Sequence, residues 1–338
     1  MIKSYAESNH GIINSVFPIE LVGKVWDYLT LTDLLRYSKT SKCNYNDVHN
    51  AIRDSVHQVL GQFCLDPARF LAELRKEHAI VSGSVALYAM LGVTFGGGND
   101  NEQDWKLNDI DVYVPILDIC KAGAPFVTYM AYMEGYHHVG RRVRAEEGYI
   151  LFPEVKDIIS LQKGTIRMDV ILSGSRSSLK PILRYHSTPV MNGISGNGMF
   201  SAYPEMTCAY HGNFNPMVFV LDRSSPKLPP VNVRRAFHKY TARSFDIRRN
   251  PSCWSDSDVV HVCTKSSHCP LTTRNVEDWG CLYITFRELE ENDGVGLKKG
   301  SISEDFDRSC WTKLTQFGLR LQIFSNSPIS CKILDDLT

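Results

Sequence analysis

The sequence predicts a mixed α/β (α+β) chain, in which a small N-terminal helical module precedes a mixed sheet with flanking helices. Two observations predict this class. Apolar residues recur at helical spacing through residues 17–60. Further along, the stretches 108–114 and 166–171 alternate apolar and polar residues, as half-buried strands do. We expect a helical module over 1–60, a sheet domain over 61–215, and a region over 216–338 that completes or covers the sheet domain.

Composition is typical of a globular protein that needs no membrane. The 338 residues are 43% hydrophobic and 22% charged, with a formal net charge of +0, so any contact with a polynucleotide has to be local. The chain has no run of eighteen apolar residues and its start lacks the apolar run of a signal peptide, so we expect no membrane partner. The ten cysteines show no disulfide-scaffold rhythm, which favours reduced thiols in the cytoplasm or nucleus.

The first helix of the N-terminal module is amphipathic. Its apolar positions recur at helical spacing at Leu21, Val22, Val25, Trp26 and Leu29. Pro18 is tolerated in a first turn, and Glu20 complements the helix dipole there. Thr32 is the expected N-cap of a second helix, and a third helix begins near Asn44.

The sheet domain opens with a strand over 78–82 that turns into a helix over 85–91. Gly83 and Ser84 lie at this turn. The first amides of a helix have no partner within the helix, and bare amides at that position suit a phosphate. We therefore expect Gly83 and Ser84 to bind phosphate.

Three aspartates follow in strand-like patterns. Asp109 and Asp111 project from the same side of one strand, and Asp169 lies in a second alternating stretch. If the two strands pair, three carboxylates converge. Such a cluster repels itself and favours divalent cations, and carboxylates bind Mg²⁺ while leaving positions open for substrate phosphates. The alternative is that Asp109 and Asp111 are turn and strand-edge residues on a solvated face.

This layout resembles the nucleotidyltransferase superfold of the DNA polymerase beta type. That pattern is a Gly-Ser turn into a helix, an Asp-X-Asp strand and one Asp on a neighbouring strand. The resemblance covers roughly residues 75–200, and the matching positions are Gly83, Ser84, Asp109, Asp111 and Asp169. It implies that the aspartates are catalytic and hold Mg²⁺, and that Gly83 and Ser84 hold a nucleoside triphosphate. The chain departs from the pattern because no Lys or Arg follows Ser84 and because the interval before Asp109 is long.

The N-terminal module is similar to the F-box, a three-helix module that docks on the Skp adaptor of cullin–RING ubiquitin ligases. The similarity rests on Phe-Pro-x-Glu-Leu from Phe17, Trp-Asp-Tyr-Leu from Trp26 and Thr-Asp-Leu-Leu-Arg-Tyr-Ser from Thr32. It implies an adaptor-binding face within residues 17–50, made of Phe17, Pro18, Ile19, Leu21, Val22, Leu34 and Leu35. We expect an exposed apolar set made of Phe17, Pro18, Leu21, Val22 and Leu34, with several of these side chains solvent-accessible and contiguous. The alternative is a helical cap whose apolar residues are all core.

The stretch from Pro181 to Asn192 extends the resemblance. Together with the Gly-Ser turn and the Asp-X-Asp strand, it is similar to a large group of proteins from mushroom-forming fungi (basidiomycetes). Members of that group commonly join an F-box-like N-terminus to a nucleotidyltransferase-like domain, and the match runs through most of residues 17–290. This supports the order of the domains and implies no particular activity. Within the stretch, His186 and Ser187 either reach the pocket or belong to a core segment.

Three further segments bear on the site. Residues 121–161 are expected to be mainly helical, and their basic and aromatic cluster at 136–144 either grips a nucleotide or RNA or is a solvated loop. Residues 239–245 carry cations and aromatics and are expected to cover the site. Residues 282–286 are expected to form a strand that closes the main fold.

The last third contains His261, Cys263, His268 and Cys269, which are zinc-ligand residue types. Zinc sites usually show paired ligands at tight, regular spacing, and these spacings are irregular. Buried reduced thiols are the simpler interpretation, and metal binding by the group stays open.

Two functions of different classes follow from the sequence. The first is a nucleotidyltransferase that moves a nucleotide to a hydroxyl acceptor by a two-metal Mg²⁺ mechanism. The second is a non-catalytic substrate receptor of an SCF-type ubiquitin ligase with a degenerate transferase fold. The aspartates favour the first function, and the missing basic residue after Ser84 favours the second. No feature of the sequence selects the nucleotide or the acceptor.

Overall fold

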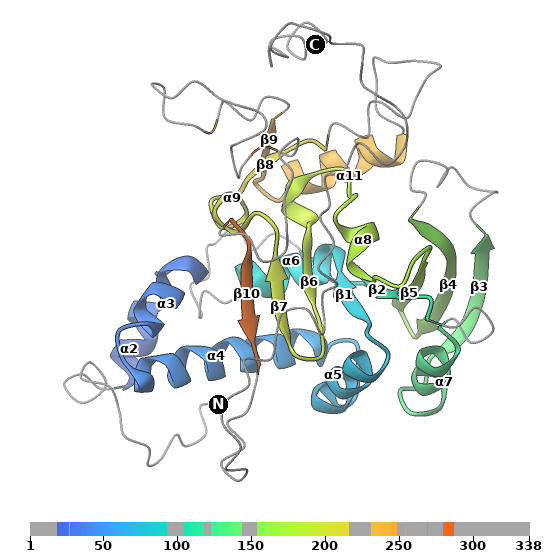
Figure 1. Ribbon diagram of the computed structural model, residues 1–338, viewed down its shortest axis with the longest axis horizontal. Coiled ribbons are helices and arrows are strands. Elements are labelled where there is room, and N and C mark those ends of the chain that lie inside the picture. Colours follow the sequence, from blue (N-terminus) through green and yellow to red (C-terminus); the bar gives the residue numbers. More distant parts are fainter. Residues whose placement is uncertain are drawn as a thin grey trace, which may run out of the picture.

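The computed structural model describes residues 19–26, 28–92, 105–117, 123–143, 154–215, 231–248, Trp254, Cys269 and 280–286. Helices flank an eight-stranded sheet, and a two-stranded sheet of β8 and β9 lies beside it (Figure 1). The elements are α2 (Ile19–Trp26), α3 (Leu31–Ser38), α4 (Lys42–Leu60), α5 (Pro67–Lys76), β1 (Ile80–Ser82), α6 (Gly83–Leu91), β2 (Asp109–Val114), α7 (Ala124–Tyr132), β3 (His137–Val143), β4 (Val155–Lys163), β5 (Ile166–Ser173), α8 (Leu179–Ile182), η2 (Thr188–Val190), β6 (Asn192–Ile194), β7 (Gly198–Ser201), α9 (Pro204–Cys208), β8 (His211–Asn213), α11 (Val231–Thr241), β9 (Asp246–Arg248) and β10 (Leu282–Thr285).

The main sheet is mixed, as predicted. Its strand order is β10-β7-β6-β1-β2-β5-β4-β3. β2 and β5 pair in parallel, whereas the other described pairs of this sheet are antiparallel. β10 forms one edge, so the expectation that residues 282–286 include a strand of the main fold is confirmed. The chain enters the sheet in the middle, at β1, and both expected aspartate strands lie on the same side of β1.

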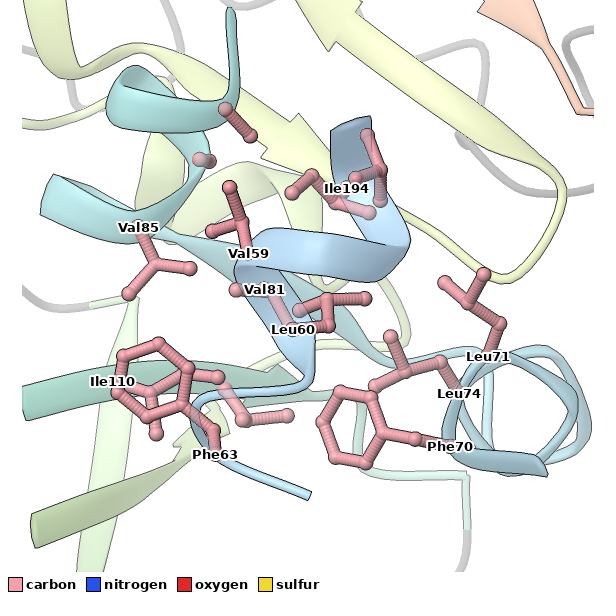
Figure 2. Close-up of a cluster of buried hydrophobic side chains, with 14 of the residues drawn as sticks. Val59, Leu60, Phe63, Phe70, Leu71, Leu74, Val81, Val85, Ile110 and Ile194 are labelled. Carbon is pink, nitrogen blue, oxygen red and sulfur yellow. The ribbon is translucent and has the colours of Figure 1, made fainter. Parts of the chain in front are cut away.

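The N-terminal helices and the sheet share one buried core. Figure 2 shows side chains of α4, α5 and the turn between them packed against β1, α6 and β2. Phe63 and Phe70 are fully buried there, next to Val81 and Ile110. Burying a side chain of this size stabilises a fold by about 1.5–3 kcal/mol. The predicted boundary near residues 60–66 falls where α4 ends at Leu60.

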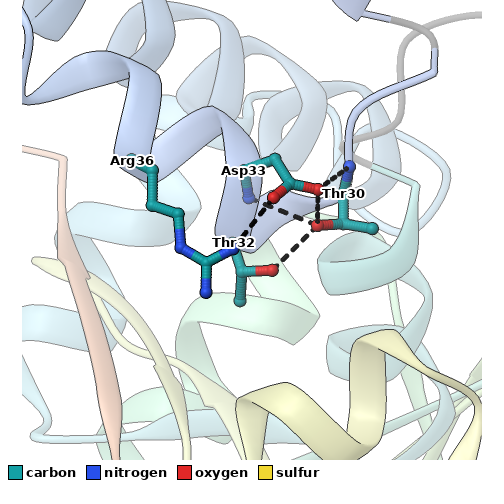
Figure 3. A network of polar contacts seen from close by, with 4 residues as sticks. All are labelled: Thr30, Thr32, Asp33 and Arg36. Atoms are coloured by element: carbon teal, nitrogen blue, oxygen red, sulfur yellow. Dashed lines mark hydrogen bonds and ion pairs between the residues drawn. The ribbon is translucent and has the colours of Figure 1, made fainter.

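The second helix begins differently from the prediction. Its N-cap is Thr30 and not Thr32, and α3 starts at Leu31. The Thr30 hydroxyl accepts from the Asp33 amide at 3.2 Å, and the Asp33 carboxylate accepts from the Thr30 amide at 3.3 Å (Figure 3). This reciprocal capping box satisfies two amides of the helix start, which the Thr32 hydroxyl cannot do from inside the helix.

The expected adaptor-binding residues divide between surface and core. Leu21 is 47% exposed, as expected, but Val22 and Leu34 are 2% and 0% exposed. The expectation that Val22 and Leu34 are exposed was therefore wrong. Leu34 packs in the core that α3 and α4 share, and α3 also lies against α9. Leu35 is partly buried against the same core and Ile19 begins α2, while Phe17 and Pro18 lie outside the described residues.

Residues 121–161 are not mainly helical, which corrects the prediction. Their one described helix is α7, and it is followed by strands β3 and β4. The buried positions of β4 carry mainly β-branched and aliphatic side chains, which favour strands. Pairing of β4 with β5 on one side and β3 on the other fixes this segment as sheet.

Among the described residues, no helix is both long enough and apolar enough to cross a membrane.

Candidate functional site

The parallel pairing of β2 with β5 brings the predicted aspartates together. Asp111 is the register partner of Asp169, and Asp109 is the partner of Arg167. Register partners on neighbouring strands project to the same face of a sheet, and so do residues two apart along a strand. Asp109, Asp111 and Asp169 therefore lie on one face, with Asp111 and Asp169 side by side.

Gly83 allows the start of α6 to approach this face closely. Its φ of +69° lies in the left-handed region that glycine enters at little cost. A Cβ at this position would lie 2.7 Å from Asp111 Oδ2, so a side chain there would displace the carboxylate. Ser82 precedes α6 without capping it, because its hydroxyl donates to the Asn192 carbonyl at 2.6 Å. The first residue of α6 therefore lies next to the Asp111 carboxylate, and no side chain caps this helix start.

Asp111 is held in an unfavourable electrostatic environment. Burial raises the pKa of Asp111 to about 7, and the carboxylates of Asp109 and Asp169 add to the shift. Lys239 and Arg167 lower the same pKa without cancelling the rise. Within the described residues, its carboxylate accepts no hydrogen bond. A carboxylate of this kind is stabilised by a proton or by a cation.

The other two aspartates face cationic groups of the chain itself. Asp169 Oδ1 accepts from the Ser160 hydroxyl at 2.6 Å and from Arg167 Nε at 3.1 Å. Lys239 Nζ lies 3.9 Å from Asp109 Oδ2, and both of these side chains are partly exposed. A pair this exposed contributes only about 0–1 kcal/mol to stability. Arg167 and Lys239 thus offset part of the repulsion among the carboxylates.

Basic groups reach the Gly-Ser turn from a distant part of the sequence. Arg243 Nη1 donates to Ser84 Oγ at 3.2 Å. The Arg243 guanidinium also stacks on Trp105, with 4.3 Å between Cζ and the ring centroid. The Tyr240 hydroxyl lies 3.4 Å from the same Ser84 oxygen. Residues 239–245 therefore lie over the Gly-Ser turn as expected, and Arg243 places a basic group beside Ser84, after which no Lys or Arg follows directly in the sequence.

Aromatic side chains fill the space between α11 and the sheet. The hydroxyls of Tyr113 and Tyr185 are 2.5 Å apart, on the same face as Asp111. His186 is buried against Tyr240, and its Nδ1 lies 2.9 Å from Ser187 Oγ. Burial lowers the pKa of His186 to about 4, so its ring is neutral at pH 7. His186 and Ser187 therefore belong to the core behind the site.

The donor set fits Mg²⁺ in chemistry. Three carboxylates share a face, and Asp111 has two carboxylate neighbours and no described hydrogen-bond donor. In the part of the chain that the structure describes, no three His, Cys, Asp or Glu side chains are arranged to hold a metal ion. Two of the carboxylates are engaged by Arg167 and Lys239 instead. Binding of Mg²⁺ here would require Asp109 and Asp169 to exchange those partners for the ion.

The other candidate residues lie elsewhere. Residues 137–143 of the cluster at 136–144 form β3, at the sheet edge, with β4 between β3 and β5. Arg141 there pairs with Asp157 at 2.5 Å. Of the possible zinc ligands, Cys269 is buried, while His261, Cys263 and His268 lie outside the described residues.

Comparison with known proteins identifies no relative. No protein-family model matches the chain, and neither the curated proteins nor the solved structures give a match.

Proposed function

We propose that this protein transfers a nucleotide from a nucleoside triphosphate to a hydroxyl acceptor in a Mg²⁺-dependent reaction. The observation that carries the proposal is the placement of Asp111 between two other carboxylates and against the uncapped start of α6. The carboxylates favour a divalent cation, and the helix start favours the phosphates that such a cation accompanies. Both preferences point to the same ligand, a metal-bound triphosphate.

Each residue of the site has a distinct role in this proposal. Asp109, Asp111 and Asp169 would hold Mg²⁺, which would lower the pKa of the attacking hydroxyl and offset charge on the leaving pyrophosphate. Gly83 and Ser84 hold the terminal phosphates, and Arg243 adds a charged donor beside Ser84. The acceptor oxygen bonds to the α-phosphorus while the bond from that phosphorus to its bridging oxygen breaks. Pyrophosphate leaves, and the hydroxyl proton passes to water.

Pyrophosphate release tests the proposed reaction. The full chain is incubated with Mg²⁺ and each common nucleoside triphosphate, with oligonucleotide, protein and polyol acceptors in separate reactions. We expect release with one acceptor class, and its loss in Asp111→Asn. The matched control is Asp54→Asn, which removes a half-exposed carboxylate from α4 and leaves release unchanged. Equal release by wild type and Asp111→Asn would exclude the reaction at this site.

A second function is favoured by a different observation, the apolar surface of the first helix. Leu21, Val25 and Tyr28 are 47%, 58% and 89% exposed on α2 and the turn after it. Exposed apolar groups gathered on one short segment are typical of a protein-binding surface. We propose that this surface docks on a Skp-type adaptor, which would make the chain a ligase substrate receptor with or without the transferase activity.

Adaptor capture tests the docking surface. Leu21→Glu combined with Val25→Glu places two charges on the exposed surface and should abolish capture, because burying unpaired charges is unfavourable. The fold should persist, since neither side chain is in the core. Tyr132→Glu is the control, because Tyr132 is 84% exposed on the distant helix α7. Capture of the double variant at the wild-type level would remove the proposal.

A further inference from the structure

The outer face of α11 is strongly basic in a chain whose formal net charge is +0. Residues 231–245 contain four Lys or Arg residues and no Asp or Glu. Arg234, Arg235 and His238 are exposed. Within the described residues, neither of these two arginines has an ion-pair or hydrogen-bond partner. This face therefore presents unneutralised positive charge to solvent.

The basic face leads into the acidic site. Residues four apart on a helix lie on the same side, about 6 Å from one another. One turn after Arg235 comes Lys239, whose Nζ lies 3.9 Å from Asp109 Oδ2. Two residues after α11 ends at Thr241, Arg243 donates to Ser84 at the start of α6. Arg235, Lys239 and Arg243 thus form a line of cations that ends at the proposed triphosphate.

We propose that the hydroxyl acceptor is the end of a single-stranded nucleic acid whose phosphates lie along α11. This inference rests on the proposed function, because it names the acceptor of that reaction. A strand supplies phosphates for the line of cations and a terminal hydroxyl for the chemistry. The rings of exposed His238 and partly exposed Trp105 lie on or beside the line, and rings of this kind accept stacked bases. An acidic peptide would match the positive charges but has no bases to stack on the rings of His238 and Trp105.

The reaction on such a strand is balanced without a further reactant. The terminal hydroxyl oxygen of the strand bonds to the α-phosphorus of the nucleoside triphosphate as the bond to the bridging oxygen breaks. The products are a strand longer by one nucleotide, pyrophosphate and a proton. Lys239 and Arg235 hold the last phosphates of the strand, so they set how far its end reaches toward Asp111.

Binding is measured apart from catalysis. The fluorescence anisotropy of labelled single-stranded RNA and DNA of identical sequence is followed with the full chain, in EDTA and without nucleotide, across a range of salt. We expect Arg234→Ala combined with Arg235→Ala to weaken binding roughly tenfold and to reduce the slope of log K against log salt by about 1.4, or about 0.7 for each lost phosphate contact. Arg234→Lys combined with Arg235→Lys should keep the wild-type slope, because both charges remain.

The matched control removes two exposed cations that follow β5 in the chain, of which Lys180 lies on α8. Arg176→Ala combined with Lys180→Ala causes the same change of net charge, and we expect unchanged affinity and slope. The inference is overturned if both alanine variants bind alike, if wild type binds neither strand, or if poly-glutamate competes as well as the unlabelled strand. Because the assay contains no Mg²⁺ or nucleotide, strand binding without pyrophosphate release refutes the proposed function and leaves α11 as a strand-binding surface without an acceptor role. Release to another acceptor class without strand binding refutes only this inference.

Discussion

The close contact between Gly83 and the Asp111 carboxylate accounts for the glycine at position 83 and for the burial of Asp111. A carboxylate on the sheet face meets the first residue of α6 so closely that a Cβ would lie 2.7 Å from its oxygen. Only glycine gives both this space and a φ of +69° without strain. In return, the approach helps to bury Asp111 and raises its pKa. The contact is costly for the unliganded protein, and under the proposed function it becomes favourable when a cation and an anion bind together.

The raised pKa of Asp111 predicts a pH-dependent effect of its removal. Its ordinary value is 3.8 and its value in the folded protein is about 7, so between these pH values the folded chain retains a proton that the unfolded chain has lost. Stability from this group is therefore fully present below about pH 4 and is lost as pH rises through about 7. Without divalent cations, we expect Asp111→Asn to melt near the wild-type temperature at pH 4 and above it at pH 8.

Thermal melts at both pH values, with Asp54→Asn as the control, check this expectation. The control should show no gap from wild type that widens with pH. An Asp111→Asn variant that melts below wild type at pH 8 would identify Asp111 as a structural carboxylate, whose hydrogen bonds are worth about 1–3 kcal/mol when lost.

Gly83→Ala separates backbone strain from the contact with Asp111. Gly135 also has a positive φ, +75°, but a Cβ there meets nothing within 4 Å. Both alanine variants should lose about 1–2 kcal/mol of unfolding free energy to strain. Gly83→Ala alone should also lose the rise in melting temperature that Mg²⁺ with nucleoside triphosphate gives wild type. A normal ligand response in Gly83→Ala would contradict the close approach.

The N-termini of α3 and α6 differ in whether a side chain caps them. α3 starts with a reciprocal capping box between Thr30 and Asp33, which satisfies its first amides internally. α6 starts without a side-chain cap, because Ser82 bonds elsewhere. A satisfied helix start contributes stability, whereas an uncapped start facing Arg243 and Asp111 is available to a phosphate.

Removal of the α3 cap tests this difference between the helices. Thr30→Ala should lower the free energy of unfolding by about 1 kcal/mol, because an amide loses its side-chain acceptor. Thr32→Ala should cost less, since the Thr32 hydroxyl bonds only to that of Thr30 among the described residues. Chemical denaturation of both variants measures the effect. A larger loss for Thr32→Ala would restore Thr32 as the stabilising residue of this helix start.

At the scale of the whole molecule, the fold brings together site residues that lie far apart in the sequence. Alternation of polar and apolar residues predicted the strands of Asp109, Asp111 and Asp169 because that signal is local. Residues 239–245 were expected to cover the site, but the individual partners of Lys239 and Arg243 were not predicted, since their contacts with Asp109 and Ser84 bridge 130 and 159 positions. Burial of Val22 and Leu34 was also missed. Helical spacing marks an apolar face without telling whether a partner or the same chain covers it.

The strands β3 and β4 were missed for another reason. Residues 121–161 include a real helix, α7, whose pattern was extended too far along the chain. β4 lies between two strands and is buried at most positions of its first half, so its sequence lacks the simple alternation of a half-buried strand. Short apolar runs of this kind are assigned correctly only when their pairing partners are known.

Calorimetric titration of a nucleoside triphosphate into the full chain tests the central claim most directly, namely that Asp109, Asp111 and Asp169 bind a metal-bound triphosphate together with α6 and Arg243. We predict binding by wild type that requires Mg²⁺, disappears in Asp111→Asn, weakens roughly tenfold in Arg243→Gln through loss of a charged hydrogen bond, and persists in Asp54→Asn. No heat of binding to wild type with Mg²⁺, or equal binding by wild type and Asp111→Asn, would contradict it.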